Sequence, residues 1–392
     1  TYSLLYKWPG QNSSLKPITF LAHLDVVPPE LETIDDWEHP PFSGAITDEF
    51  IWGRGTLDDK SSVFGVLEAI EHLINQGFVP DRTIYLAFGH DEEIGGHDGA
   101  ARIAEYFKQE GIKSLFTLDE GMVILDENLS PAKQVTGVIG IAEKGYLTLN
   151  ITARVEGGHS SLPGKISAVG TLARAITALE DNQMSSSLSG PSGELFDYMG
   201  PEMGFVEKML FANRWLFEGP ILSILESKKS TAAMVRTTTA VTMVNGGIKE
   251  NVLPSQVSAV ANFRILPGNT GQDVLDHVRS VVNNPAVTVE ISNPKGAKEP
   301  SAISATDTPE FGELGKTIKQ IFKGALFTPG LVLAGTDSPH YQQVAENNYR
   351  FAPYTFGPED LGLVHGVNER IGINDYELMI KFYAQLIMNL DS

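Results

Sequence analysis

The stretch TIYLAFGHDEEIGG, residues 83–96, joins an apolar run to a strongly acidic turn. The apolar part belongs to an expected strand over 82–89, and its nearly continuous hydrophobic character is typical of strands in a parallel sheet buried on both faces. The acidic part follows directly, with Asp91, Glu92 and Glu93 in a row. Such a cluster is either a solvated surface turn or a metal site with its own base, and the rest of the sequence decides between the two.

Residues 1–145 alternate strand and helix signals around this stretch. Gly77 and Gly111 follow two amphipathic segments and are well placed to end helices there. Buried strands that alternate with such helices predict a parallel sheet covered by helices on both faces. The expected strands span 17–25, 82–89 and 114–121, and the expected helices span 61–77 and 100–111.

The pattern changes after residue 145. Residues 146–157 alternate apolar and polar side chains, as a half-exposed antiparallel strand does. The order of the elements that follow predicts a ferredoxin-like α+β unit, with a four-stranded sheet backed by two helices. These elements are helices over 166–180 and 270–283, strands over 237–247, 256–266 and 286–292, and an irregular, partly helical insertion over 183–235.

We therefore predict an α/β protein whose catalytic domain has a mostly parallel, helix-flanked sheet and is interrupted by this α+β unit. Residues 1–145 and 294–392 form the catalytic domain, because strand–helix alternation returns after residue 294 and ends in a helix over 374–390. Residues 146–293 form the inserted domain.

Composition excludes several classes of function. The formal net charge of the 392 residues is −20, which argues against nucleic acid as a partner because a phosphate backbone requires a basic face. No cysteine is present, so any metal ligand must be His, Asp or Glu. No apolar run reaches the ~18 residues that a membrane span needs. Because the sequence begins at Thr1 rather than Met, we expect a missing N-terminal segment, and a cytoplasmic, periplasmic or secreted location stays open.

Polar residues gather where the expected strands end. In an open α/β sheet, ligands bind outside the carboxyl ends of the strands. His23 and Asp25 end the first strand and share one face, so Asp25 can orient His23. The other candidates are Glu92 and Glu93, the pair Asp119 and Glu120, and Asp58 with Asp59 just before the helix over 61–77.

Each of these turns alone has an ordinary structural explanation, but together they place many ligands at one sheet edge. Their number and type suit two divalent ions, with zinc as the first choice and manganese or cobalt as alternatives. A second histidine is still needed, and His365, within the glycine-rich segment 362–372, supplies it. In the doubled glutamate, one carboxylate can hold a metal while its neighbour takes a proton from water.

Eight motifs in this order resemble those of the dizinc metallopeptidases of the aminoacylase, carboxypeptidase S and glutamate carboxypeptidase type. The resemblance covers nearly the whole chain. The motif LDEG and the long insertion are most similar to the carboxypeptidase S and N-acyl-amino-acid hydrolase branch. The motifs are AHLDVVP, WGRGTLDDK, DEEIGG, LDEG, GGHSS, FRILPG, GTDSPHY and VHGVNE.

This resemblance implies a role for each candidate. It implies two Zn²⁺ ions bridged by Asp58, whose peptide bond to Asp59 would be cis. Glu92 would be the general base, and Asp25 would orient His23. The implied metal ligands are His23, Asp58, Glu93, Asp119 and His365, with Glu120 left open as the alternative to Asp119.

The inserted domain resembles a lid and dimerisation domain. The resemblance implies a homodimer through this domain, although a monomer stays open because the insertion over 183–235 could cover that surface. His159 would stabilise the oxyanion of its own or a neighbouring active site. Where relatives often carry an arginine, this chain has Pro339, which leaves that contact and the substrate preference open. The implied substrate-binding residues are Asn251, Arg264, Gly335, Thr336 and Asp337.

Together these observations predict a dinuclear zinc metallopeptidase or amidohydrolase that cleaves an amide bond next to a free carboxylate. The expected substrates are short peptides or N-acyl amino acids, attacked by a metal-bridged water that Glu92 activates. A deacetylase or amidohydrolase of a biosynthetic intermediate with the same dinuclear site is the alternative. A non-catalytic binding module would be expected to have lost a ligand or Glu92, and this sequence has lost neither.

Overall fold

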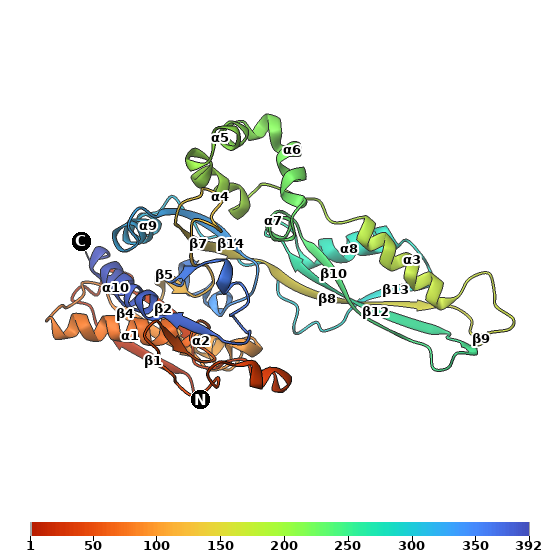
Figure 1. Ribbon diagram of the computed structural model, residues 1–392, viewed down its shortest axis with the longest axis horizontal. Coiled ribbons are helices and arrows are strands. Elements are labelled where there is room, and N and C mark those ends of the chain that lie inside the picture. Colours follow the sequence, from red (N-terminus) through yellow and green to blue (C-terminus); the bar gives the residue numbers. More distant parts are fainter. Residues whose placement is uncertain (1, 392) are drawn as a thin grey trace. The chain divides into compact units, whose positions relative to one another are not determined.

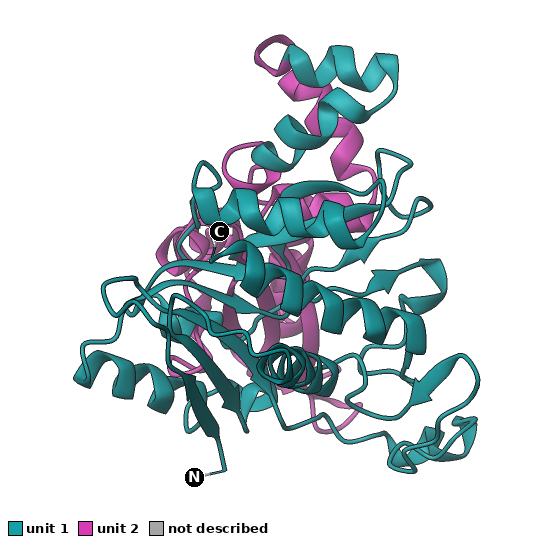
Figure 2. Cartoon of the chain, turned by 90° about the vertical axis from the view of Figure 1, so that its left-hand side faces the viewer, with its two compact units in different colours: residues 1–142, 193–213, 302–392 teal, residues 143–192, 214–301 magenta. Residues whose placement is uncertain are grey.

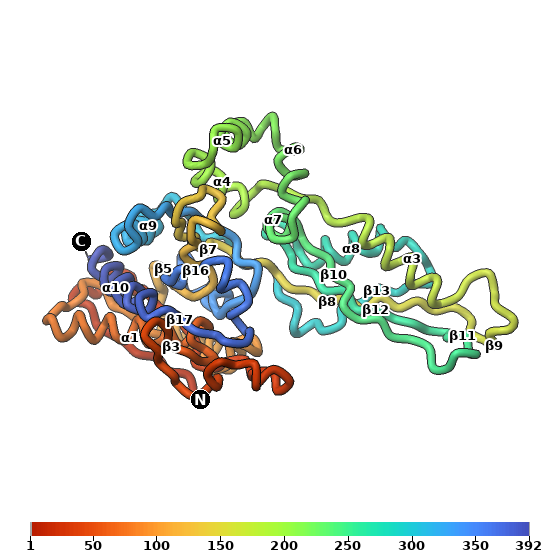
Figure 3. Tube along the Cα trace, viewed as in Figure 1, coloured from red at the N-terminus to blue at the C-terminus, as the bar shows by residue number. Residues whose placement is uncertain are grey.

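The computed structural model describes residues 2–391, which form two compact units (Figure 2). Unit 1 contains the residues up to 142, residues 193–213 and the residues from 302 onwards. Unit 2 contains residues 143–192 and 214–301. The elements within each unit can be followed by label and by colour in Figures 1 and 3.

Unit 1 is built on a nine-stranded sheet. Its strands are β1 (Leu4–Trp8), β2 (Ile18–His23), β4 (Ile84–Gly89), β5 (Ser114–Asp119), β6 (Ile124–Leu125), β7 (Thr136–Glu143), β14 (Leu326–Val332), β15 (Ala345–Arg350) and β16 (Thr355–Phe356). The central strands β4, β2, β5 and β15 lie side by side and are all parallel. Every residue of β2 and β4 is buried, which explains the unbroken apolar character of both strands.

Helices cover both faces of this sheet, as predicted. They are α1 (Lys60–Asn75), α9 (Pro309–Ile321) and α10 (Ile373–Asn389) on one face, and α2 (Ala100–Gln109) on the other. Phe20 and Phe88 pack with the first three helices, whereas their sequence neighbours Leu21 and Ala87 pack with Phe107 of α2. Successive side chains of a strand point to opposite faces, so each strand contributes to both parts of the core.

A small two-stranded sheet joins two loops of unit 1. β3 (Phe50–Trp52) pairs antiparallel with β17 (Arg370–Gly372). β3 leads into residues 53–59 ahead of α1, and β17 follows residues 362–369, so this pairing brings the two loops together. The 3₁₀ turns of the unit are η1 (Leu31–Asp36), η2 (Glu92–Ile94), η4 (Ser338–Tyr341) and η5 (Pro358–Asp360), with η3 (Gly200–Glu202) in the insertion.

Unit 2 is the predicted four-stranded antiparallel sheet backed by two helices. Its strands lie in the order β10 (Thr238–Gly246), β12 (Gln256–Ile265), β8 (Gly145–Arg154), β13 (Val287–Ile291). Leu147, Leu149 and Ile151 alternate along β8 and pack against α3 (Ala168–Asp181) and α8 (Gly271–Val282). A separate pair, β9 (Gly158–His159) and β11 (Val252–Leu253), forms a second small sheet.

The insertion is more helical than the sequence predicts. It contains α4 (Pro191–Met199), α5 (Phe205–Ala212), α6 (Arg214–Glu226) and α7 (Lys229–Val235). These helices are short, glycines and a proline separate the first two, and Pro220 lies inside α6, so no long apolar period marks them. Residues 193–213, which include α4 from its third residue and all of α5, belong to the compact unit 1. The predicted domain boundaries at 145/146 and 293/294 stay predictions.

Among residues 2–391, none of the helices combines the length and the apolar character required to cross a bilayer.

Candidate metal centre

Parallel strands of unit 1 bring their carboxyl ends to one place. The register sets His23 beside Gly89 at the ends of β2 and β4, and Phe20 beside Leu118 in β2 and β5. The turn η2 follows β4 directly, and Glu120 follows β5. Ligands bind at this edge of open α/β sheets, which is where the sequence predicts the site.

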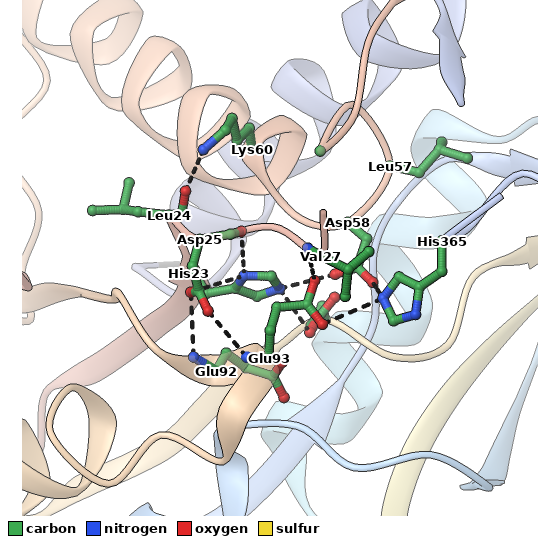
Figure 4. Close-up of polar contacts among 12 residues, drawn as sticks. His23, Leu24, Asp25, Val27, Leu57, Asp58, Lys60, Glu92, Glu93 and His365 are labelled. Atoms are coloured by element: carbon green, nitrogen blue, oxygen red, sulfur yellow. Dashed lines mark hydrogen bonds and ion pairs between the residues drawn. The ribbon is translucent and has the colours of Figure 1, made fainter. Parts of the chain in front are cut away.

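Asp58 lies between two histidines that come from distant parts of the sequence (Figure 4). Its Oδ1 is 2.8 Å from His23 Nε2, and its Oδ2 is 2.9 Å from His365 Nε2. The Asp58–Asp59 peptide bond is cis, which confirms that prediction. A carboxylate that points one oxygen at each imidazole has the arrangement expected of a ligand shared by two cations.

Two sets of three ligand atoms share Asp58. The sets are His23, Asp58 and Glu120, and Asp58, Glu93 and His365, and the atoms of each set lie within 4.8 Å of one another. His23 Nε2 is 3.4 Å from Glu120 Oε1, and His365 Nε2 is 3.3 Å from Glu93 Oε2. Ligands of a tetrahedral zinc ion, each about 2.0–2.1 Å from the metal, lie roughly 3.3 Å apart. The two histidine–glutamate distances match this value, whereas the distances from Asp58 to the histidines, 2.8 and 2.9 Å, are shorter. The donor types fit a divalent ion in each set.

Glu120, rather than Asp119, completes the first set. Asp119 is the last residue of β5 and is buried, and its Oδ2 accepts a hydrogen bond of 2.9 Å from Ser338 Oγ. Its Oδ1 accepts the backbone N–H of Glu120. Adjacent residues at a strand end point to opposite sides, so only one of the two can face His23. The geometry thus brings Glu120, the alternative that the sequence leaves open, close to His23 and Asp58, and the assignment of Asp119 stays a prediction.

The electrostatics of the cluster favour a bound cation. Burial alone would lower the pKa of His23, but Glu120, Asp25 and Asp58 raise it well above its ordinary value. Burial, with the nearby Asp58, raises the pKa of Glu120 to about 8. A histidine that attracts a proton and a carboxylate that retains one both indicate an excess of negative charge, which a divalent ion would compensate.

Glu92 belongs to neither set of ligands. Burial and the neighbouring Glu120 raise the pKa of Glu92 to about 9. The backbone N–H groups of Glu92 and Glu93 donate to the two carboxylate oxygens of Asp25, at 3.2 and 3.1 Å (Figure 4). Asp25 Oδ1 also lies 3.4 Å from His23 Nδ1, and the Asp25 backbone oxygen lies 3.1 Å from the same atom. Asp25 therefore contacts both the histidine and the turn η2, which we call the glutamate turn.

Three predicted site residues lie in unit 2. His159 and Asn251 are exposed and close together, because Val252 pairs with His159 and the N–H of Ser160 donates to the Asn251 carbonyl. Arg264 lies in β12 on the face away from the helices, with its guanidinium 4.8 Å from the centre of the Tyr146 ring.

The predicted substrate loop, residues 335–337, is only partly open to solvent. Gly335 is exposed, but Thr336 and Asp337 are buried. Asp337 packs closely against Gly96, which follows the glutamate turn. A Cβ added to Gly96 would lie only 2.1 Å from Asp337 Oδ1. Burial, and then Asp119, raises the pKa of Asp337 to about 8. Pro339 lies in the first turn of η4.

Comparisons with known proteins identify the family of this chain. A family model described as "Peptidase family M20/M25/M40" matches residues 19–389. "Probable carboxypeptidase S-like 2" of Dictyostelium discoideum is 44% identical over 393 residues, which cover 100% of this chain and 75% of that protein. "N-fatty-acyl-amino acid synthase/hydrolase PM20D1.1" of Danio rerio is 42% identical, with the same coverage.

A solved structure shows the same fold. The M20 family metallo-carboxypeptidase Sso-CP2 from Sulfolobus solfataricus is similar with a TM-score of 0.68 at 18% identity, over 98% of this chain and 87% of that chain. The match of the family model, the two relatives and this fold confirm the resemblance that the eight motifs indicate. The chain is an enzyme of the hydrolase class, and it belongs to peptidase family M20/M25/M40.

Proposed function

We propose that this enzyme hydrolyses amide bonds next to a free carboxylate, in N-acyl amino acids and short peptides. The observation that carries the proposal is the Asp58 carboxylate, with one oxygen toward His23 and the other toward His365. The names of two relatives support the substrate class, since one is carboxypeptidase S-like and the other is an N-fatty-acyl-amino acid synthase/hydrolase.

The proposed cofactor is a pair of zinc ions, which manganese or cobalt could replace. His23, Asp58 and Glu120 would hold one ion, and Asp58, Glu93 and His365 would hold the other. When bound, the ions polarise the scissile carbonyl group and lower the pKa of water. Imidazole and carboxylate ligands without thiolate fit these metals.

Glu92 is the residue that we assign to proton transfer. Its carboxylate stays outside both ligand sets, and its backbone N–H is held by Asp25. A carboxylate fixed in this way can take a proton from the attacking water at its Oε atoms and return that proton to the departing amine. Asp25 then acts as a positioning residue for both Glu92 and His23.

Unit 2 contributes the proposed contacts to the rest of the substrate. Arg264 carries a planar guanidinium, which can bind a carboxylate through two parallel hydrogen bonds, as recognition of a free carboxylate requires. We assign stabilisation of the oxyanion to His159, and a second polar contact to Asn251, because His159 is exposed in β9 and Asn251 is exposed directly before the neighbouring strand β11.

The proposal is tested by product analysis with matched substrates. N-oleoyl-phenylalanine and a dipeptide should both be cleaved by the zinc-loaded enzyme, and their C-terminal carboxamides should react far more slowly because they lack the carboxylate. Oleate and phenylalanine supplied together test the reverse condensation. Equal cleavage of acids and carboxamides would contradict recognition of a free carboxylate.

The variant Glu92→Gln tests the assigned proton transfer. The amide cannot accept the proton, so kcat should fall by roughly 10²–10⁴-fold. Because Glu92 is not a ligand in either set, metal analysis by mass spectrometry should still find two ions per chain. A variant that stays active, or that loses an ion, would remove Glu92 from this role.

A further inference from the structure

A buried ion pair joins the loop that carries Asp58 to the loop that carries His365. Arg54 Nη1 lies 2.6 Å from Glu369 Oε2. The exposed fraction is 5% for Arg54 and 0% for Glu369, so neither charge is available to solvent. Neither residue belongs to a ligand set, and the roles assigned above to the catalytic and ligand residues do not explain why this pair is present.

The second oxygen of Glu369 organises the backbone that leads to Asp58. Oε1 accepts hydrogen bonds from the N–H groups of Gly55 at 3.0 Å, Leu57 at 2.9 Å and Asp58 at 3.3 Å. The loop is therefore wrapped around one carboxylate oxygen, and successive N–H groups that converge in this way form a small anion-binding nest. The position of the Asp58 backbone depends on where Glu369 lies.

The second terminal nitrogen of Arg54 holds the other loop. Nη2 donates to the carbonyl oxygens of His365 and Gly366, both at 3.0 Å. His365 itself has a φ of 61°, which is uncommon for a residue other than glycine and is retained only when the surroundings impose it. Arg54 supplies this constraint directly, since it contacts the carbonyl group of the same residue.

We propose that Arg54 and Glu369 are positioning residues that set the distance between Asp58 and His365, and thereby form the second metal set. The inference rests on the proposed dinuclear centre. The first set takes His23 from β2 and Glu120 from the end of β5, which are fixed by the sheet. The second set takes His365 from a loop, so it depends more strongly on the ion pair.

Titration of the metal-free protein with Co²⁺, followed by calorimetry and by visible absorption, tests this inference. The wild-type protein should bind two ions. Glu369→Gln should weaken binding of the second ion roughly 10–100-fold, the range for residues that orient metal ligands. The first ion should be weakened less, because Asp58 belongs to both sets while His23 and Glu120 keep their places at the sheet. The absorption spectrum of the second ion should change as well, because its ligands would move.

Arg54→Lys provides a second variant that keeps the charge. Lysine cannot reproduce the planar fork that reaches Glu369 and two carbonyl groups at once, so the second ion should again bind more weakly. Leu314→Ala, a buried substitution in α9, is the matched control for a general loss of stability. It should leave both affinities unchanged.

The outcomes separate the inference from the proposed function. If the wild-type protein binds two ions and the variants of Arg54 and Glu369 do so with unaltered affinities, the positioning role is wrong while the dinuclear centre stands. Equal weakening of both ions, or weakening by Leu314→Ala of the same size, would reduce the pair to a purely structural role. Uptake of only one ion by the wild-type protein would overturn both ideas.

Discussion

Asp119 and Glu120 are adjacent acids with different surroundings, and only Glu120 faces His23. The Asp119 carboxylate accepts from Ser338 and from the backbone of Glu120, whereas Glu120 Oε1 lies 3.4 Å from His23. At the scale of single residues, the side of the strand end that each carboxylate occupies therefore determines which of the two lies near His23.

Substitution of each acid in turn checks this assignment. Glu120→Gln should lose or greatly weaken one metal ion, because it removes a charged ligand from the set with His23 and Asp58. Asp119→Asn should keep both ions, since its amide oxygen can still accept one of the two hydrogen bonds. Metal content by mass spectrometry measures the difference, and the reverse pattern would restore Asp119 as the ligand.

Lys144 is a buried lysine in unit 2. Its Nζ donates to the carbonyl oxygens of Ala233 and Arg236 at 2.8 and 2.7 Å. Burial, and then the nearby Arg264 and Arg236, lower the pKa of Lys144 to about 7. Folding therefore favours the neutral amine, and this preference makes the stability of the protein depend on pH.

The variant Lys144→Met tests the sign of that dependence. Since the lysine pKa is about 10.4 in an unfolded chain, the unfolded state binds more protons between pH 7 and pH 10.4. Relative to the variant, the free energy of unfolding of the wild type should rise with pH across this window, by at most about 1.4 kcal/mol per pH unit. Urea unfolding of both proteins measures it, and a constant difference would contradict the lowered pKa.

At the scale of elements, the turn after β4 is fixed by two contacts, one with Asp25 and one with Asp337. Asp337 fills the space that the absent side chains of Gly89 and Gly96 leave beside this turn. A Cβ on Gly89 would lie 2.6 Å from Asp337 Oδ2. The glycines around the acidic motif therefore permit a close approach that fixes η2, the element that carries Glu92.

Two matched glycine variants test this packing. Gly77 and Gly96 both have positive φ, 77° and 68°, but only Gly96 has Asp337 in the way, since nothing lies within 4 Å of a Cβ on Gly77. Gly77→Ala should cost about 1 kcal/mol of unfolding free energy, from the backbone conformation alone. Gly96→Ala should cost more, and it alone should lower kcat. Equal costs with unchanged kcat would show that Asp337 does not constrain the turn.

At the scale of the whole molecule, the two units contribute different things. Both ligand sets found among residues 2–391 come entirely from unit 1. Unit 2 supplies His159, Asn251 and Arg264, which are proposed to contact substrate. Metal binding should therefore act first on the stability of unit 1.

Hydrogen exchange with and without zinc measures this division. A ligand present at 100 times its Kd stabilises the folded state by about 2.7 kcal/mol. Backbone amides of β2 and β5 should gain more protection on addition of zinc than those of β8 and β12, because His23 lies in β2 and Glu120 directly follows β5. Equal gains in both units would show that metal binding stabilises the molecule as one cooperative body.

The sequence by itself determined the fold class and most of the candidate site. Unbroken apolar runs indicated strands buried on both faces, and the alternation in 146–157 indicated a sheet with one exposed face. These are local patterns of apolar and polar residues, so they can be read without knowledge of the rest of the chain. The rule that ligands gather at carboxyl strand ends pointed to His23 and to the acidic pairs 58–59, 92–93 and 119–120. The number of ligands that two ions need added His365, and the resemblance to the metallopeptidases assigned the individual roles.

Only the tertiary structure decided what depends on loops that are distant in sequence. It brought Glu120 rather than Asp119 close to His23, buried Asp337 beside the turn that carries Glu92, and paired Arg54 with Glu369. No local period encodes such contacts, because the order of strands in the sheet and the pairing of β3 with β17 determine which loops meet. The sequence supplies the charged groups, whereas the distances between them arise only when the whole sheet is assembled.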